Sequence, residues 1–267
     1  MKLPRVLILS IALACSGASC SSSATSSSVP VATSDCTSFV LTGHPDYPPV
    51  AWRSDGSLAG GGVIVAERLA RASKVRMVLL AEPTWEDAQA AVRAGRADFI
   101  VGIYKTTARL AYFDYLDPAL APDPSAVVIR SGETFPYKNW NSLIGKRGAV
   151  GAGESYGSKF DAFRAAKLTT YDVPTLADVF AQVLAGKADY GLSGYYTAVT
   201  SAPKGIAYAS KNFVTEGLYL AYGKQSRCGA ALAKAFSSGI AQMKAAGTID
   251  RIFARELQIY EATHPHA

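Results

Sequence analysis

Arg109 is the residue whose type and setting point most directly to chemistry with a small molecule. It follows a short apolar strand by a tight turn, and Thr106 stands three residues before it. A guanidinium presents a planar fork of N–H donors, which matches a carboxylate through two parallel hydrogen bonds. Arg109 is therefore a candidate for binding a carboxylate. The alternative is a surface arginine that forms an ion pair with a nearby acid.

Glu154 and Ser155 form a second polar group, directly after Gly153 and at the expected start of a helix. Backbone N–H groups at a helix N-terminus can hold the same anion as an arginine. The plainer interpretation is that Ser155 only caps the helix. The two interpretations are compatible, because a capping residue can also face a ligand.

This chain has few residues of the types that covalent or metal-dependent catalysis requires. His44 is the only histidine of the expected folded body, and two cysteines, Cys36 and Cys228, remain beyond the leader. A histidine-based triad or a His/Cys metal site therefore lacks ligands. The run Gly60-Gly-Gly62 opens a helix but lacks the glycine spacing of a nucleotide-binding loop. We expect no catalytic residue, no metal and no cofactor.

The beginning of the chain is typical of an export signal followed by a linker. Basic residues precede the apolar run 6–14, which is too short for an ordinary membrane span. We expect residues 1–20 to be a signal peptide and the Ser-rich residues 21–35 to be a flexible tether. Cys15 or Cys20 could carry a lipid after cleavage, although neither fits the usual lipobox well. The alternative is simple cleavage and release.

The remaining roughly 230 residues are enough for one large or two small domains with real cores. The formal charge of +6 is spread over scattered basic residues without a basic stripe, so we do not expect nucleic-acid binding. Beyond the leader, no segment has eighteen uninterrupted apolar residues, which predicts a soluble body. In an exported protein, a single cysteine pair favours a Cys36–Cys228 disulfide over two buried thiols.

Two stretches that lie 91 residues apart repeat a sequence: residues 83–98 and 174–189 are identical at nine of sixteen positions. Each stretch has a threonine suited to an N-cap, Thr84 or Thr175, with an acidic residue three positions on that can complete a capping box. A helix-forming run, a glycine suited to the left-handed C′ position and a short apolar strand follow. The repeat indicates two similar α/β units, and small ligands favour the crevice between such units.

Strands alternate with helices along the whole body, which predicts an α/β fold of largely parallel sheets with helices on both faces. The first lobe is expected to comprise residues 36–126 and 216–267, and the second lobe residues 127–215. The two crossings between the lobes form a hinge. Outside the repeats, the expected helices are 63–72, 155–166, 228–246 and a last helix capped by Thr248; the expected strands are 39–41, 75–80, 125–130, a segment near 169 and 217–222.

Seven short motifs follow one another between Phe39 and Leu257. They are Gly43-His-Pro-Asp-Tyr-Pro-Pro49, Trp85 before a helix ending Ala-Gly-Arg-Ala-Asp98, Thr106-Thr-Ala-Arg109, Phe113-Asp-Tyr115, Gly153-Glu-Ser-Tyr156, Gly186-Lys-Ala-Asp189 and Gly247-Thr-Ile-Asp-Arg-Ile-Phe253. In this order they resemble the extracytoplasmic solute-binding proteins of ABC importers, of the amino-acid-binding type (family 3, type II periplasmic-binding-protein fold). The resemblance implies two lobes that close on a small solute and deliver it to a membrane permease.

The resemblance also implies roles for individual residues. Arg109, with Thr106 before it, holds the ligand's carboxylate, and Tyr47 and Trp85 stand where the family places aromatic walls around the ligand's side chain. For these two rings the alternative is plain core. His44 occupies a position that carries an acid in binders of basic amino acids, and it is either a pH-sensitive donor to the ligand or a solvated loop residue.

One departure from the family pattern concerns the ligand's amino group. Gly194, beside Tyr195, stands where the family has an aspartate that pairs with the ligand's ammonium. Without that acid, an α-amino group would lack its counter-charge, and burying an unpaired ammonium is costly. Glu154 could supply the missing acid from across the cleft.

A second departure is the segment from Gly102 to Thr106, which is one residue shorter than the common pattern. It puts Tyr104 and Lys105 where small hydroxyl residues normally stand, and Lys105 adds positive charge near Arg109. Both departures favour an organic acid or another anionic or aromatic solute over an ordinary amino acid. The expected ligand-binding residues are Arg109, Tyr47, Trp85, Ser155, Thr106, Tyr104, His44, Glu154, Tyr195 and Gly102.

We therefore expect a monomeric, extracytoplasmic binding protein that captures a small carboxylate-bearing solute for an ABC-type permease. One alternative is an enzyme on the same fold, of the periplasmic cyclohexadienyl dehydratase kind, with Glu154 as the general acid. Another alternative is a ligand sensor that presents its closed form to a membrane signalling partner.

Overall fold

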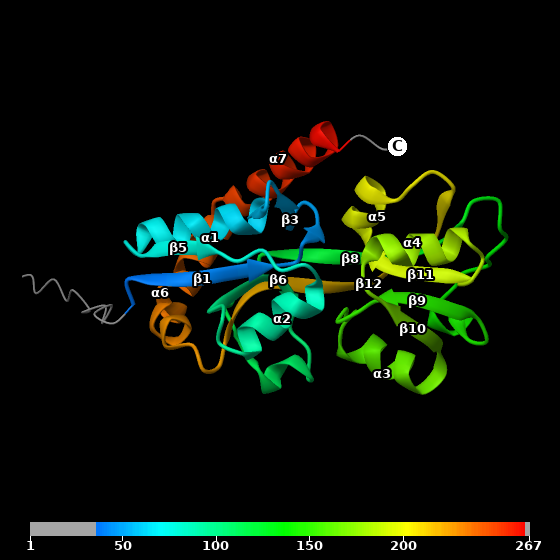
Figure 1. Ribbon diagram of the computed structural model, residues 1–267, viewed down its shortest axis with the longest axis horizontal. Coiled ribbons are helices and arrows are strands. Elements are labelled where there is room, and N and C mark those ends of the chain that lie inside the picture. The colour runs from blue at the N-terminus through cyan, green and yellow to red at the C-terminus, as the bar shows by residue number, and fades with distance from the viewer. Residues whose placement is uncertain (1–35, 265–267) are drawn as a thin grey trace, which may run out of the picture. The chain divides into compact units, whose positions relative to one another are not determined.

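The computed structural model describes residues 36–264, which form an α/β fold around one mixed sheet (Figure 1). The predictions of a signal peptide, a tether and a lipid anchor lie outside these residues. The sheet contains β1 (Ser38–Gly43), β5 (Arg76–Leu79), β6 (Phe99–Tyr104), β7 (Phe113–Tyr115), β8 (Ala121–Arg130), β9 (Arg147–Gly151), β10 (Thr169–Val173), β11 (Tyr190–Gly194) and β12 (Ile206–Gly223). The helices are α1 (Gly61–Ala72), α2 (Trp85–Arg93), α3 (Ser158–Lys167), α4 (Leu176–Leu184), α5 (Tyr195–Ser201), α6 (Arg227–Ala245) and α7 (Thr248–Thr263).

The strand order is β10-β9-β11-β8-β12-β6-β1-β5, with β7 paired to β12 off this path. At one end β5, β1 and β6 run parallel, with α1, α2, α6 and α7 around them, and we call this part the first lobe. At the other end β10, β9 and β11 run parallel, with α3, α4 and α5, and form the second lobe. Parallel neighbours require crossover connections, which here contain the helices. The predicted two-lobed α/β fold is confirmed.

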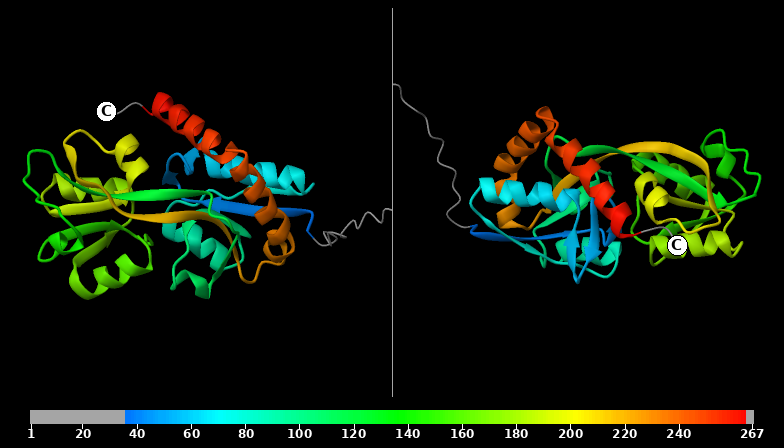
Figure 2. Two further views of the ribbon diagram at one scale, coloured as in Figure 1. Left: turned by 180° about the vertical axis from the view of Figure 1, so that it is seen from behind. Right: turned by 90° about the horizontal axis from the view of Figure 1, so that it is seen from above.

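Two long strands connect the lobes. β8 and β12 pair antiparallel from Ala121 opposite Leu218 to Arg130 opposite Ile206, and both continue from one lobe into the other (Figure 2). The predicted lobe boundaries, after residues 126 and 215, fall inside these two strands. The two crossings are thus hydrogen-bonded to each other along most of β8.

The repeated sequence folds into the same helix and strand twice. In α2 and α4 the hydroxyls of Thr84 and Thr175 accept the N–H of the residue three positions on, at 3.1 Å in both cases. The reciprocal bond of a full capping box forms only at Thr175, where Asp178 accepts its N–H at 3.0 Å. Each helix is followed by a glycine with positive φ, 75° at Gly95 and 67° at Gly186, as the C′ position requires.

The core of the first lobe is sealed by the predicted disulfide. Cys36 and Cys228 join the start of β1 to the first turn of α6, across 192 residues of sequence. Beside it, Phe39 packs edge-on against Phe99 and Phe236 at centroid distances of 5.0 and 5.6 Å. All three rings are buried, so α6 is fixed to the sheet by both covalent and apolar contact.

Local boundaries differ from the predictions in a few places. Helix α3 begins at Ser158 rather than at Ser155, because Gly157 adopts a φ of 89° and interrupts the turn before it. Thr248 is the first residue of α7 and not its cap; Gly247 occupies the cap position in the left-handed conformation. Helix α5 and the small sheet of β2 (Asp46–Tyr47), β3 (Ala51–Ser54) and β4 (Ser57–Ala59) were not predicted.

The C-terminal helix also changes the histidine count of the folded body. Because α7 continues to Thr263, it brings His264 onto Tyr260, with stacked rings 4.1 Å apart. His44 is therefore not the only histidine of the folded body. Across residues 36–264, no helix is long and apolar enough to cross a membrane.

Candidate functional site

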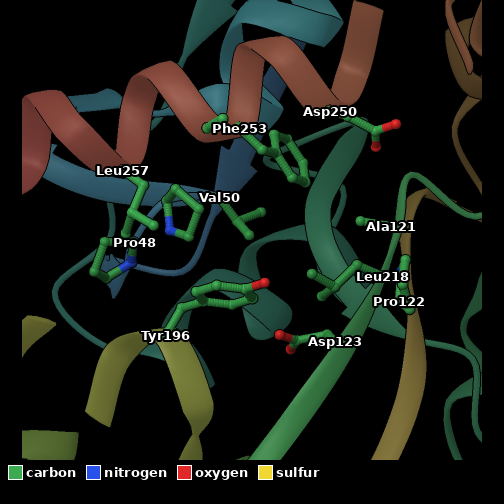
Figure 3. Close-up of a pocket in the computed structure, with 12 residues that line it drawn as sticks. Pro48, Val50, Ala121, Pro122, Asp123, Tyr196, Leu218, Asp250, Phe253 and Leu257 are labelled. Carbon is green, nitrogen blue, oxygen red and sulfur yellow. The ribbon is translucent and has the colours of Figure 1, made fainter. Parts of the chain in front are cut away.

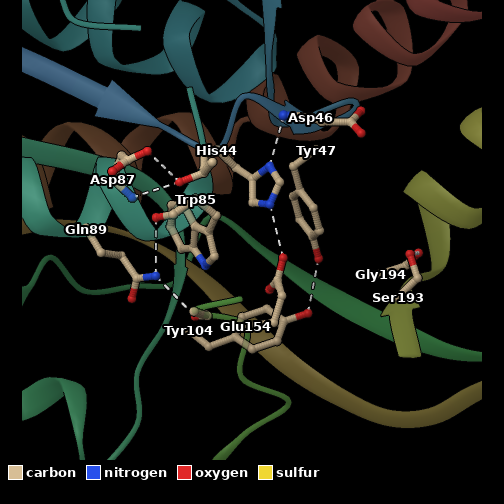
Figure 4. Close-up of polar contacts among 12 residues, drawn as sticks. His44, Asp46, Tyr47, Trp85, Asp87, Gln89, Tyr104, Glu154, Ser193 and Gly194 are labelled. Atoms are coloured by element: carbon tan, nitrogen blue, oxygen red, sulfur yellow. Dashed lines mark hydrogen bonds and ion pairs between the residues drawn. The ribbon is translucent and has the colours of Figure 1, made fainter. Parts of the chain in front are cut away.

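Eight of the ten predicted ligand-binding residues surround one small cavity between the lobes, which we call the cleft cavity. They are His44, Tyr47, Trp85, Gly102, Tyr104 and Arg109 from the first lobe, and Glu154 and Ser155 from the second. Figure 4 shows the polar contacts made by four of these eight, His44, Tyr47, Tyr104 and Glu154. The cleft cavity leaves about 10 Å³ for the centre of a water molecule, room for roughly one water. The two lobes are thus closed on each other, and the side chains of the site fill most of its space.

Arg109 begins the 3-10 turn η1 (Arg109–Ala111), and its side chain is buried, with an exposed fraction of 8%. Its Nη2 donates to the carbonyl oxygen of Gly153 at 2.9 Å, and its Nη1 donates to that of Tyr104 at 3.4 Å. Within residues 36–264, no carboxylate lies within 4.0 Å of the guanidinium. Burial lowers the pKa of Arg109, and the charge of Glu154 opposes that effect. A buried cation that is bonded only to backbone carbonyls lacks a counter-charge, and an anion could supply one.

Aromatic rings form the walls beside this guanidinium. His44 lies between Tyr47 and Trp85, at ring-centroid distances of 5.3 and 5.1 Å, and the guanidinium carbon of Arg109 is 5.6 Å from the Trp85 ring. Trp85 Nε1 is buried and has no hydrogen-bond partner in the described part of the chain. Because an unpaired buried N–H is costly, this donor and Arg109 together favour an acceptor-rich ligand.

A polar contact joins His44 to Glu154 across the cleft. Nδ1 of His44 accepts the N–H of Asp46 at 2.9 Å, which assigns the proton of a neutral imidazole to Nε2. Nε2 then donates to Glu154 Oε1 at 3.0 Å, and both side chains are largely buried. The Glu154 side chain of the second lobe thus contacts the aromatic group of the first lobe through His44.

Asp123 is a site-adjacent acid that the sequence analysis missed. It lies on the crossing strand β8, is 2% exposed, and its Oδ2 accepts the hydroxyls of both Tyr47 and Tyr104. Burial raises the pKa of Asp123 to about 6, against the lowering effect of the two tyrosine hydroxyls. Burial also raises the pKa of each tyrosine well above its usual value. The available signal was an aspartate between two prolines, two residues before Ser125 in the expected strand.

The Tyr47 ring, which is bonded to Asp123, explains why position 194 is a glycine. A Cβ on Gly194 would lie 2.6 Å from the hydroxyl oxygen of Tyr47 and 2.9 Å from its ring carbon Cζ. The Tyr47 ring therefore takes the space that a side chain at 194 would need. The Tyr47 hydroxyl that occupies this point donates to Asp123.

The other predicted site residues lie at different places. Thr106 does not line the cleft cavity; its hydroxyl accepts the N–H of Arg109 at 3.4 Å and positions that turn. Ser155 lines the cavity, but its hydroxyl donates to Asp161. The hydroxyl is therefore already used within the second lobe. Tyr195 is not brought to the cavity and packs on Tyr196, 5.3 Å between ring centroids.

Lys105 points away from the cleft. Its Nζ is 3.8 Å from Asp117 and sits over the rings of Tyr115 and Tyr219, at 5.8 Å from each centroid. It therefore adds no direct contact at Arg109. Among the residues that the structure describes, no group of three or more His, Cys, Asp or Glu side chains is arranged to hold a metal ion.

Comparison with known proteins gives a family and a fold. Residues 40–258 match the family model described as bacterial extracellular solute-binding proteins, family 3. A search of curated protein sequences finds no significant match.

Solved structures share the fold at low sequence identity. An arginine-binding protein from T. maritima (a P235GK mutant) is 19% identical, with a TM-score of 0.70 over 83% of this chain and 96% of that one. The amino acid ABC transporter substrate-binding protein AbpA from Streptococcus pneumoniae, bound to L-arginine, is 19% identical, with a TM-score of 0.70 over 84% and 96% of the two chains. A histidine kinase sensor domain with similarity to periplasmic binding proteins is 20% identical, with a TM-score of 0.70 over 84% and 97%.

Proposed function

Because this chain belongs to family 3 of the bacterial extracellular solute-binding proteins, we propose that it captures a small carboxylate-bearing solute in the cleft cavity and delivers it to an ABC-type permease. The ligand-binding residues in this proposal are those that line the cavity. Arg109 holds the solute's carboxylate, Trp85 and Tyr47 flank its body, and Glu154 with the backbone of Gly153 closes on it from the second lobe.

The observation that carries this proposal is the buried guanidinium of Arg109. It has N–H groups aimed across the cleft, only backbone carbonyls as acceptors, and the unpaired Nε1 of Trp85 on the same cavity. A carboxylate that replaces the Gly153 carbonyl would give the cation a counter-charge and two parallel hydrogen bonds. It would also offer an acceptor to Trp85, which a neutral apolar solute could not do.

Lobe closure couples this recognition to delivery. Arg109 belongs to the first lobe and Gly153 to the second, and a solute that contacts both favours the closed form by its differential contacts. Because the cleft cavity has room for only about one water in the closed form, the lobes must separate, which breaks the His44–Glu154 contact, before a solute can enter. A permease can then distinguish the loaded from the empty protein by the position of the second lobe.

The solute class within this proposal is an organic acid or an amino-acid-like molecule. Gly194 provides no acid for an ammonium group, which favours an acid without an amine. Glu154 is the carboxylate that lines the cleft cavity, and Asp123 lies behind Tyr47, bonded to its hydroxyl. An amine-bearing solute would therefore depend on Glu154.

The test is native mass spectrometry of protein purified without denaturation, with Arg109→Ala as the matched variant. We expect the native protein to retain a small molecule that contains a carboxylate, and the variant to lose it. Incubation of that molecule with fresh protein should leave it unchanged. A retained molecule without an anionic group, or equal retention by the variant, would contradict the proposal, and conversion of the molecule would indicate an enzyme.

A further inference from the structure

A second and larger cavity lies at the crossing strands, and we call it the hinge cavity (Figure 3). Its volume is about 310 Å³, within the usual range of small-molecule sites. It shares no lining residue with the cleft cavity. The Tyr47 hydroxyl, bonded to Asp123, marks the boundary, because Tyr47 lines only the cleft cavity and Asp123 only the hinge cavity.

The wall of the hinge cavity is mostly apolar. Val50, Leu218, Phe253 and Leu257 face it, and Figure 3 shows their side chains around the same space as Tyr196. Such a wall suits a hydrocarbon or aromatic body, since its burial removes apolar surface from water.

The charged groups of the hinge cavity are both acidic. Asp123 lies at its floor and Asp250, in the first turn of α7, at its exposed rim. Within residues 36–264, no lysine, arginine or histidine nitrogen lies within 4.0 Å of the Asp123 carboxylate. The cavity thus combines an apolar body with negative charge and no basic partner for it.

Only one of the two carboxylate oxygens of Asp123 accepts hydrogen bonds from neighbouring side chains. Its Oδ2 accepts the hydroxyls of Tyr47 and Tyr104, whereas its Oδ1 accepts no hydrogen bond from the described part of the chain. Burial raises the pKa of Asp123 to about 6, so the carboxylate ionises as the pH becomes mildly alkaline, and it then has no basic side chain within 4.0 Å. A buried charge of this kind is stabilised when a cation with N–H donors reaches its free oxygen.

We propose that the hinge cavity binds a small primary ammonium with an apolar body, whose N–H groups bond to Oδ1 of Asp123. The walls come from both lobes and both crossing strands: Phe253 from α7, Tyr196 from α5, Asp123 from β8 and Leu218 from β12. An occupant therefore contacts both lobes and both crossing strands. Its binding biases lobe closure without touching the cleft cavity.

The test uses phenethylammonium as the probe and phenethyl alcohol as its neutral analogue, each titrated into the protein at mildly alkaline pH and followed by NMR chemical shifts. We expect saturable binding of the amine and an affinity for the alcohol that is weaker by about tenfold or more, since only the amine meets the carboxylate. Asp123→Asn should weaken amine binding about tenfold or more, because it removes the charge and keeps the shape.

A second variant keeps the test decisive if Asp123→Asn folds poorly. Ala254 lies on the exposed side of α7 and lines the hinge cavity, so Ala254→Leu fills space there without disturbing the core. It should weaken amine binding and leave thermal stability unchanged. Arg109→Ala should leave amine binding unchanged, which separates this proposal from the proposed function. Equal binding of amine and alcohol, no saturable binding, or full binding by both cavity variants would overturn it.

Discussion

Arg109 Nη2 donates a 2.9 Å hydrogen bond to the carbonyl oxygen of Gly153, so a side chain of the first lobe is bonded to the backbone of the second. Gln89 Nε2 donates to the same oxygen at 3.1 Å. One carbonyl thus receives two donors from across the cleft. The closed arrangement depends on the backbone conformation of Gly153, whose φ of 75° lies in the left-handed region.

The first prediction concerns Gly153→Ala, with Gly95→Ala as its control. Both glycines have a φ of 75°, so both alanines strain the backbone by about 1 kcal/mol. Only the Cβ at 153 meets the other lobe, at 2.8 Å from Gln89 Nε2, whereas nothing lies within 4 Å of the Cβ at 95. Small-angle scattering of the ligand-free protein should show a larger radius of gyration for Gly153→Ala alone. An equal radius for the two variants would contradict the prediction.

The second prediction concerns the His44–Glu154 pair. Because both side chains are largely buried in the closed form, His44→Ala and Glu154→Ala should be coupled by about 1 kcal/mol or more in a double-mutant cycle of urea unfolding. The exposed pair of Arg71 and Glu67 is the control, and its coupling should stay below about 0.5 kcal/mol. Additive effects at His44 and Glu154 would show that the contact is absent from the ligand-free protein in solution.

The third prediction concerns the disulfide. Its loop spans 192 residues, and a chain-entropy treatment assigns about 5 kcal/mol to closing a loop of that length in the unfolded chain. Replacing both Cys36 and Cys228 by serine should lower the thermal midpoint by roughly 10 °C, measured by calorimetry. Reducing agent should lower the midpoint of the native protein and leave the double variant unchanged. A midpoint that is insensitive to reductant would count against the bond.

The fourth prediction concerns the pH dependence of stability at Asp123. Its pKa is raised from 3.8 to about 6 by burial, with Tyr47, Tyr104 and Glu154 as the groups that act on it. The folded form therefore binds the proton more tightly than the unfolded form, and the stabilisation present below the unfolded pKa is lost as pH rises through the folded pKa. The loss amounts to about 3 kcal/mol.

Asp123→Asn should remove this loss. The free energy of unfolding, measured by urea titration at several pH values, should fall between pH 3.8 and about 6 more steeply in the native protein than in the variant. The difference between the two curves isolates Asp123 from the other carboxyls. A difference that does not change with pH would mean that this carboxyl titrates normally.

Local signals in the sequence predicted most of the fold. Thr84 and Thr175 cap their helices through neighbours three residues away, and Gly95 and Gly186 end them, so the repeat could be read without tertiary information. The start of α3 could not be predicted from local sequence, because it depends on the positive φ of Gly157. That glycine is held against Glu216, which comes from a distant strand.

In the site, too, some residues could be predicted from the sequence and others depend on contacts that only the fold makes. Arg109, Tyr47 and Trp85 were predicted from a family resemblance, and the structure brings them to one cavity; their roles toward a ligand stay predictions. Asp123 was missed because its partner Tyr47 is 76 residues away in the sequence, and only the fold brings the two together. The effect of Gly194 likewise depends on the packed ring of Tyr47.

The central claim is that Arg109 binds the carboxylate of the solute, and isothermal titration calorimetry tests it most directly. The titrant is the solute recovered from the native protein, and Lys105→Ala is the control, since it removes a nearby positive charge that points away from the cleft. Arg109→Ala should weaken binding by about 2 kcal/mol or more, and Lys105→Ala by less than about 0.5 kcal/mol. Unchanged affinity in Arg109→Ala would remove this residue from the site and contradict the account.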